Sequence, residues 1–274
     1  AELLGEPERK PKVVTVDNGG HAVELRVHTP ETRTAKGILY HMHGGGMIMS
    51  SARGYDPLAA LLAKRLGAVV VSVEYRLAPE TRFPGPIEDC YAGLVWTAAN
   101  AAELGADPAR LVICGESAGG GLAASLALLA RDRGEVAVSA QVLTYPMLDH
   151  RTGGPDDPYD NPLAGQVSWG RQNNQYGWTA LSGGAEIAEG QLAYYSAARA
   201  RDLSGLPKTW IGTGSLDLFV DECFDFGARL AKAGVPVEFH AYPGAPHAFD
   251  SYPKTAVARQ MIRDRMEAFA RFLG

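Results

Sequence analysis

Cysteine is scarce in this chain and is not arranged for cross-linking. The three cysteines, Cys90, Cys114 and Cys223, are an odd number, lie far apart and include no Cys-x-x-Cys pair. A disulfide framework needs an even set of cysteines, and a structural zinc site needs closely spaced ligands. The sequence therefore predicts reduced, mostly buried cysteines. It gives no sign of a disulfide scaffold, a metal site or a cofactor.

Long apolar runs and strong charge are missing as well. The longest nearly continuous apolar run, Leu122–Ala130, is far too short to span a bilayer. No apolar core of a signal peptide is visible near the N-terminus. The formal net charge of −5 is unfavourable for binding nucleic acid or an anionic membrane. We therefore expect a cytoplasmic protein with no nucleic acid partner and no integral membrane association, and a homodimer stays open.

What the chain does contain is a regular alternation of predicted strands and helices. Its 274 residues, 46% of them hydrophobic and 21% charged, suit one globular domain, 1–274. Strands are expected at Pro11–Asp17, Ala22–His28, Gly37–Met42, Ala68–Glu74, Arg110–Cys114, Val138–Thr144, Lys208–Gly212 and Val235–Tyr242. Helices are expected at Asp56–Gly67, Pro86–Leu104, Ala118–Arg133, Asp221–Lys232 and Lys254–Leu273. A hairpin followed by this alternation predicts an α/β fold, with a mostly parallel sheet of about eight strands and helices on both faces.

One long segment interrupts the alternation. Residues 149–205 separate two predicted strands that a simple crossover would join with far fewer residues. The middle of this segment holds Trp169, Tyr176 and Trp178 at spacings compatible with one face of a helix. The segment is either a surface excursion with a small core of its own or a cap over a ligand site. Loops after parallel strands gather where ligands bind, which favours a functional interpretation.

A serine lies in a glycine-rich turn between a predicted strand and a predicted helix. Gly115–Gly120 reads Gly-Glu-Ser-Ala-Gly-Gly and follows the apolar run Leu111–Cys114. This context is what a Gly-x-Ser-x-Gly nucleophile elbow requires. Glycines leave room for the tight backbone, and the hydroxyl would lie at the positive end of a helix. Ser117 is therefore the candidate nucleophile, and Glu116 is expected to hydrogen-bond within the elbow.

A second glycine cluster follows another predicted strand. His43–Gly46 reads His-Gly-Gly-Gly and comes directly after the strand at Gly37–Met42. Taken alone, such a triplet is also compatible with a flexible turn. Beside the elbow, it indicates backbone N–H groups that stabilise the oxygen that becomes negative in acyl transfer, as in esterases and lipases. A phosphate cradle fits less well, because no Lys-Ser or Lys-Thr follows either glycine cluster.

A serine nucleophile needs a base, and the base needs an acid that orients it. After an elbow of this type, the acid and then the base follow on loops beyond later strands. His247 lies between the last predicted strand and the final helix and is the candidate base. His150 comes too early in the chain, and His240 lies within the strand. Asp217 follows a predicted strand and is the candidate acid, with Asp221 as the fallback.

Several further motifs make the chain resemble a known family. They are Tyr75–Glu80, Phe83–Pro84, Glu88–Asp89, Tyr145–Pro146, Asp202–Pro207, Asp221–Glu222 and Tyr242–Phe249. With the two glycine motifs, they resemble the bacterial hormone-sensitive-lipase-like carboxylesterases of the α/β-hydrolase superfamily. The resemblance extends from about residue 36 to the end of the chain and implies an α/β-hydrolase fold with a small cap.

Carried over by position, the resemblance implies two sets of functional residues. The implied triad is Ser117, Asp217 and His247. The implied oxyanion hole consists of the backbone N–H groups of Gly45, Gly46 and Ala118. No metal or cofactor belongs to this set.

Departures from the family pattern concern the substrate more than the chemistry. Met47 follows the glycine triplet where an aromatic residue is usual, and Leu218–Phe219 follow the acid where Pro-Leu is usual. Ala248 follows the base where glycine is frequent. Members of the family also carry an N-terminal helical cap segment, and only a short stretch precedes the first strand predicted here. Either the cap is reduced or this sequence lacks part of it.

The expected activity is hydrolysis of a small carboxylic ester through a serine acyl-enzyme. Short to medium acyl chains are expected, because residues 149–205 are rich in polar residues and glycine and hold few aromatic residues to line a pocket. An amidase or peptidase with the same triad is the alternative. A non-catalytic receptor on this scaffold is less favoured, because such receptors lose the histidine base and this chain retains His247.

Overall fold

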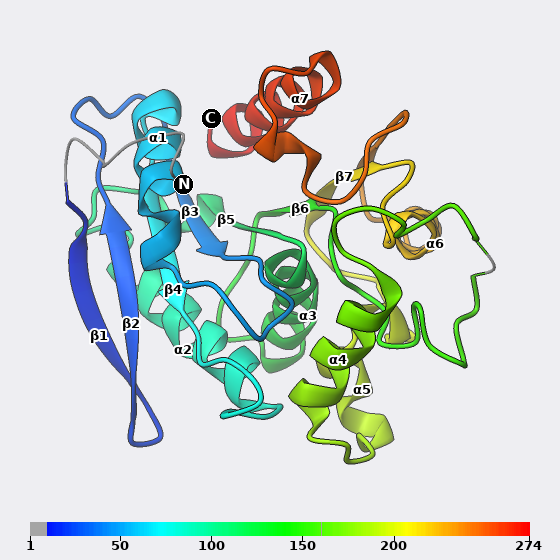
Figure 1. The fold of residues 1–274 in the computed structure, drawn as a ribbon. Coiled ribbons are helices and arrows are strands. Elements are labelled where there is room, and N and C mark those ends of the chain that lie inside the picture. The colour runs from blue at the N-terminus through cyan, green and yellow to red at the C-terminus, as the bar shows by residue number, and fades with distance from the viewer. Residues whose placement is uncertain (1–9, 160) are drawn as a thin grey trace.

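The computed structural model describes residues 10–159 and 161–274, and its strands form an eight-stranded sheet in the order β1-β2-β4-β3-β5-β6-β7-β8 (Figure 1). The strands are β1 (Lys12–Asn18), β2 (His21–His28), β3 (Ile38–Met42), β4 (Val69–Glu74), β5 (Leu111–Glu116), β6 (Ala140–Thr144), β7 (Lys208–Gly214) and β8 (Val237–Tyr242). β2 pairs antiparallel with β1 and β4, and the other neighbours are parallel. The predicted mostly parallel sheet is confirmed.

The helices follow the predicted alternation, with two additions in the long insertion. They are α1 (Asp56–Leu66), α2 (Gly85–Asn100), α3 (Ala118–Arg133), α4 (Arg171–Ser182), α5 (Leu192–Tyr195), α6 (Val220–Lys232) and α7 (Ala256–Leu273). Short 3-10 helices lie at Arg53–Tyr55, Pro108–Arg110, Glu189–Gln191, Ala197–Arg199 and Phe249–Ser251. α1 ends at Leu66 and is capped by Gly67, which is left-handed with φ 59° as its predicted capping role requires. α2 ends at Asn100, earlier than expected, and the chain continues in turns to Gly105.

Apolar side chains fill both faces of the sheet. Ile38 and Tyr40 of β3 belong to one core, which α2, α3 and α6 cover, while Leu39 belongs to the other, which α1 and α7 cover (Figure 1). Successive strand residues point to opposite faces, so a strand buried on both sides needs a nearly continuous apolar sequence. This explains the uninterrupted apolar runs in the central strands. The predicted helices on both faces are confirmed.

The aromatic residues of residues 149–205 do not share one helix face. Trp169 precedes α4, because the chain is still extended at Gly170, where φ is −106°. Within α4, Trp178 is buried whereas Tyr176 is 58% exposed. Residues two positions apart in a helix differ by about 200° around its axis, so they cannot face the same way. The prediction of a common face was wrong.

The three cysteines are free and buried, as predicted. Burial raises the pKa of each thiol well above its usual value, so none is a thiolate. In the part of the chain that the structure describes, no helix is both long and apolar enough to cross a membrane. A reduced N-terminal cap would concern residues before Lys10, which lie outside the described residues.

Candidate active site

Ser117 lies at a sharp turn between β5 and α3. Its φ of 56° and ψ of −119° are rare for a residue with a side chain, and such a conformation costs about 1–3 kcal/mol. Backbone hydrogen bonds hold it in place: Ser117 N donates to Thr144 O at 2.9 Å, and Ser117 O accepts from Met147 N at 3.0 Å and Gly121 N at 2.9 Å. The turn therefore presents Ser117 from a fixed backbone.

Both glycines that flank this turn are required by close backbone approach. A Cβ atom at Gly115 would overlap the carbonyl group of Gly119, and one at Gly119 would overlap the carbonyl oxygens of Met42 and His43. The elbow is thus packed directly against the end of β3. This is the physical basis of the Gly-x-Ser-x-Gly pattern in this chain.

The structure brings the three predicted triad residues together. His247 Nε2 lies 2.9 Å from Ser117 Oγ, and His247 Nδ1 lies 2.8 Å from Asp217 Oδ2. Asp217 is fully buried, and its Oδ1 accepts a hydrogen bond from Phe219 N at 3.0 Å. This geometry suits an imidazole that donates Nδ1–H to the carboxylate, which leaves Nε2 free to accept the serine proton.

The other candidate acid and bases have different partners. Asp221 accepts a hydrogen bond from Asn161 Nδ2 at 2.8 Å. His240 lies in β8 with its Nε2 2.8 Å from Glu238 Oε1, as expected for a strand residue. The ring of His150 packs against those of Trp178 and Tyr195 in the insertion. None of these three replaces a triad residue.

The glycine triplet lies against the nucleophile. A Cβ atom at Gly44 would lie 2.9 Å from Glu116 O and 3.5 Å from Ser117 Cβ. Gly45 has a φ of 124°, and a Cβ atom there would overlap the backbone of Met49. Side chains are thus excluded along this loop. On the other side of the serine, Ala118 is the first residue of α3, so its N–H has no partner within the helix.

A buried histidine and tyrosine fix the shape of this loop. The ring of His43 stacks on that of Tyr75, with centroids 4.2 Å apart. Burial lowers the pKa of His43 to about 4, so the ring is neutral and its Nδ1–H can donate to Gly44 O at 2.8 Å. Tyr75 OH donates to His43 O at 2.7 Å. The sequence did not predict a role for either side chain, although both lie in motifs that carry the family resemblance.

Glu116 does not hydrogen-bond within the elbow as predicted. Its Oε2 lies 2.9 Å from His41 Nε2 on β3, and its Oε1 lies 3.8 Å from Arg265 Nη1 on α7. Glu116 is the last residue of β5, so its side chain points to the neighbouring strand and the covering helix. Burial opposes its charge, but His41 and Arg265 more than offset this and hold the pKa of Glu116 below its usual value.

The insertion touches loops on both sides of the triad. Gly165 N donates to Leu216 O at 3.1 Å, beside the acid. The indole of Trp169 rests against Gly46, where a Cβ atom would overlap it, and a Cβ atom at Gly177 of α4 would lie 2.8 Å from Gly46 O. Trp169 Nε1 donates to Asn174 Oδ1 at 3.3 Å, which orients the ring. The insertion therefore spans from the acid loop to the glycine triplet.

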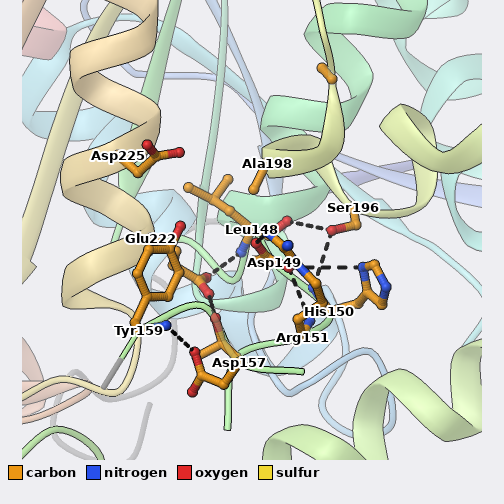
Figure 2. Close-up of polar contacts among 12 residues, drawn as sticks. Leu148, Asp149, His150, Arg151, Asp157, Tyr159, Ser196, Ala198, Glu222 and Asp225 are labelled. Atoms are coloured by element: carbon orange, nitrogen blue, oxygen red, sulfur yellow. Dashed lines mark hydrogen bonds and ion pairs between the residues drawn. The ribbon is translucent and has the colours of Figure 1, made fainter. Parts of the chain in front are cut away.

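The base of the insertion contains a buried carboxyl group that the sequence did not reveal. Figure 2 shows Glu222 of α6 beside Leu148 and Asp149. Glu222 Oε1 accepts a hydrogen bond from Leu148 N at 2.6 Å, and Oε2 contacts the hydroxyl of Thr152. Asp149 instead pairs with Arg151 at 2.6 Å. Burial and the neighbouring Asp149 raise the pKa of Glu222 well above its usual value.

Together these groups are those needed for acyl transfer: a serine with a base, a buried acid behind the base, and backbone N–H groups beside the nucleophile. The described residues contain no group of three His, Cys, Asp or Glu side chains that could hold a metal ion.

Comparisons with known proteins show which family the chain is similar to. A family model described as "alpha/beta hydrolase fold" matches residues 39–251. The carboxylesterase NlhH of Mycobacterium tuberculosis is 34% identical over 261 residues, which are 92% of this chain and 78% of that protein. A bacterial heroin esterase structure superposes with a TM-score of 0.89 at 34% identity, covering 100% of this chain and 88% of that one. Human hormone-sensitive lipase is 33% identical over 129 residues, 47% of this chain and 12% of that protein.

Proposed function

The chain belongs to the alpha/beta hydrolase fold family, among its hormone-sensitive-lipase-like carboxylesterases, and we propose which of its residues perform the ester hydrolysis that this membership entails. It is an ester hydrolase. The residue assignment rests on two hydrogen bonds of His247. They join its Nε2 to Ser117 Oγ at 2.9 Å and its Nδ1 to Asp217 Oδ2 at 2.8 Å.

In the proposed mechanism, Ser117 is the nucleophile and His247 the general base. As Ser117 Oγ attacks the ester carbonyl carbon, its proton passes to His247 Nε2. Asp217 holds the imidazole through Nδ1–H and stabilises the imidazolium that forms. His247 then protonates the alcohol oxygen as the bond between this oxygen and the carbonyl carbon breaks. The alcohol departs, and the acyl group remains attached to Ser117. A water molecule, deprotonated by His247, attacks the acyl-serine and releases the acid.

The negative oxygen of each tetrahedral intermediate needs donors that are already in place. We propose the backbone N–H groups of Gly45, Gly46 and Ala118 for this role. The glycine triplet packs against Ser117, and Ala118 begins a helix whose first N–H groups are free to bind an anion. Removing one such donor from a serine hydrolase typically costs about 10²–10³ in kcat.

We also propose that residues 149–205 act as a cap within a single domain, 1–274. Its contacts with the acid loop and the glycine triplet support this role. A cytoplasmic location is part of the proposal and is supported by the free, buried cysteines. Sedimentation analysis would show whether the chain forms the homodimer that its sequence leaves open.

The residue assignment is tested by removing the nucleophile and the base. Ser117→Ala and His247→Ala should each lower kcat by about 10⁴-fold or more, and the double variant should be little worse, because the triad acts as a unit. Ser125→Ala, which removes another buried serine hydroxyl from α3, is the matched control and should retain activity. Circular dichroism would show that all variants are folded. If Ser117→Ala kept a tenth of the wild-type activity, the assignment would be wrong.

An ester and its matched anilide separate the two hydrolase alternatives. We expect a p-nitrophenyl ester to be cleaved far faster than the p-nitroanilide of the same acid, with both activities lost in Ser117→Ala. Faster cleavage of the anilide would instead identify the chain as an amidase.

A further inference from the structure

A buried arginine on α7 connects the loops that carry the nucleophile and the base. Arginine is almost never fully buried unless it is paired, and the side chain of Arg265 is only 7% exposed. Its Nη2 lies 3.1 Å from Asp250 Oδ2, and its Nη1 lies 3.3 Å from Thr144 Oγ1 and 3.8 Å from Glu116 Oε1. Burial opposes its charge, but the two carboxylates more than offset this and raise the pKa of Arg265, so it is a cation.

Asp250 connects Arg265 to the imidazole of His247 through Tyr145. It lies three residues after His247, and its Oδ1 accepts a hydrogen bond from Tyr145 OH at 2.6 Å. The ring of Tyr145 meets the ring of His247 edge-on, with centroids 4.8 Å apart. Phe219 makes a similar contact at 5.1 Å. The imidazole is therefore held by two aromatic rings, and only Tyr145 has a hydroxyl that fixes its own position.

The backbone of Tyr145 adopts a strained conformation that its contacts hold in place. Its φ is 34°, a left-handed conformation that an aromatic residue rarely adopts. Tyr145 N donates to Gly212 O at 2.7 Å, and the hydroxyl bond to Asp250 ties the other end of the residue. Strained residues of this kind persist only where several contacts determine them together.

We propose that Asp250 is a positioning residue for the base, held by Arg265 and acting on His247 through Tyr145. This inference rests on the proposed triad but concerns residues outside it. Rotation of the imidazole changes the approach of Nε2 to Ser117 Oγ, and small displacements of reacting groups are costly in catalysis. The same guanidinium lies 3.8 Å from Glu116, which precedes Ser117, so one cation contacts residues next to both the nucleophile and the base.

The charges of this cluster also act on the imidazolium that forms during the reaction. Asp217 is hydrogen-bonded to the base. Tyr145 connects the base to Asp250, whose carboxyl group pairs with the Arg265 cation, and Glu116 is the second carboxyl group near that guanidinium. Tyr145 is a neutral donor between them, because burial raises the pKa of its hydroxyl. Neutralising Asp250 leaves the Arg265 cation less compensated, which disfavours the imidazolium.

Two mild variants test the proposal against a second tyrosine–aspartate pair that lies beside the same helix, α7. Tyr145→Phe removes the hydroxyl bond, and Asp250→Asn removes the charge. Tyr242→Phe and Asp264→Asn are the controls, because Tyr242 OH donates to Asp264 Oδ2 at 2.8 Å and Asp264 is next to Arg265 on α7. The measurements are kcat, KM, the pH profile of kcat/KM and the melting temperature.

We expect each test variant to lower kcat by about 10-fold or more, with KM changed by less than about twofold. Asp250→Asn should also move the acidic limb of the kcat/KM profile to lower pH by about 0.5–1 unit. The double variant should be less impaired than the product of the single effects, since both residues act through one contact. The controls should lower the melting temperature but leave kcat and the pH profile unchanged.

Two outcomes would overturn the positioning role. In the first, both test variants have a lower melting temperature, as the controls do, but keep the wild-type kcat and pH profile. The cluster would then contribute to stability only. In the second, the controls lose as much kcat as the test variants. Ser117→Ala is assayed in parallel: if it is inactive while Asp250→Asn is unchanged, only the positioning role fails. If Ser117→Ala is active, the proposed function fails instead.

Discussion

At the scale of single residues, the site depends on how closely the backbone of the elbow approaches β3. Gly119→Ala would place a methyl group onto the carbonyl oxygens of Met42 and His43. Because both partners are backbone atoms, the methyl group can be accommodated only if the elbow or the strand moves. We expect a loss of about 1–3 kcal/mol or more in unfolding free energy and a fall in kcat of about 100-fold, because Ser117 moves with the elbow.

Gly190→Ala is the control for this prediction. An added Cβ atom meets nothing within 4 Å at Gly190, so thermal unfolding and kcat should match the wild type. Equal activity of Gly119→Ala and the wild type would show that the elbow does not require this close approach.

The same scale shows which site residues a sequence can reveal. Ser117 was identified by a local pattern, and His247 and Asp217 by their order after it. Asp250 and Arg265 carry no such signal, because an ion pair between a loop and a helix depends on how the two pack. Glu116 was noticed but given the wrong partners, since a motif does not say which way a strand residue faces.

At the scale of elements, Glu222 joins the first turn of α6 to the start of the insertion. Its two oxygens meet Leu148 N and the hydroxyl of Thr152 (Figure 2). A glutamate at this position of a helix is normally favourable as a charge near the N-terminus. Here it is fully buried beside Asp149, and burial outweighs that preference and raises the pKa of its carboxyl group.

The raised pKa of Glu222 predicts how the free energy of unfolding depends on pH. Its pKa is raised in the folded protein, so its contribution is complete below the unfolded value of about 4.3 and is lost as pH rises toward the folded value. Glu222→Gln preserves both hydrogen bonds without a titrating proton. The variant should therefore gain stability relative to the wild type as pH rises from 5 to 8, by up to about 1.4 kcal/mol per pH unit.

Urea unfolding at several pH values measures this difference. Glu186→Gln, at an exposed glutamate in the same insertion, is the control and should show no such trend. If the stability of Glu222→Gln relative to the wild type fell as pH rose, the group would be ionised in the folded protein.

The insertion also shows where element prediction failed. Strand bounds were predicted to within two residues, because apolar runs and glycines mark them locally. The prediction of a common face for the aromatic residues near α4 was wrong, because residue spacing alone does not indicate that the helix starts at Arg171, after Trp169. Trp169 is oriented by Asn174 and by its contact with Gly46, and neither contact is visible in a sequence.

At the scale of the whole molecule, the order of strands in the sheet assembles the site. β3 lies beside β5, so the glycine triplet meets the nucleophile, and β7 lies beside β8, so the acid meets the base. β6 lies between these pairs and ends just before Tyr145, which touches His247. The sequence predicted the strands and the parallel sheet but not the order of the strands in it, because that order depends on how distant segments pack.

We expect the proposed cap to set the size of the acyl group that this site accepts. Trp169 rests on Gly46, one of the proposed oxyanion donors, so we expect its ring to limit the space for the acyl chain there. Each buried methylene contributes about 0.8 kcal/mol, so catalytic efficiency should rise with acyl length only until the pocket ends, which we place at about four to eight carbons. A p-nitrophenyl ester series from acetate to palmitate measures this limit. A wild-type maximum at twelve carbons or more would contradict the proposed cap.

Removing the indole tests whether Trp169 forms that limit. Trp169→Ala should move the maximum of kcat/KM to longer acyl chains and weaken the preference for short ones, since the vacated volume can hold further methylenes at about 0.8 kcal/mol each. Tyr176→Ala removes an aromatic side chain from the same insertion that is 58% exposed, and it should leave the chain-length profile unchanged. If both variants kept the wild-type maximum, the acyl chain would lie elsewhere. Only Trp169 of the two residues rests on the glycine triplet. If both variants shifted the maximum equally, the shift would therefore come from a general change in the insertion and not from the contact of Trp169.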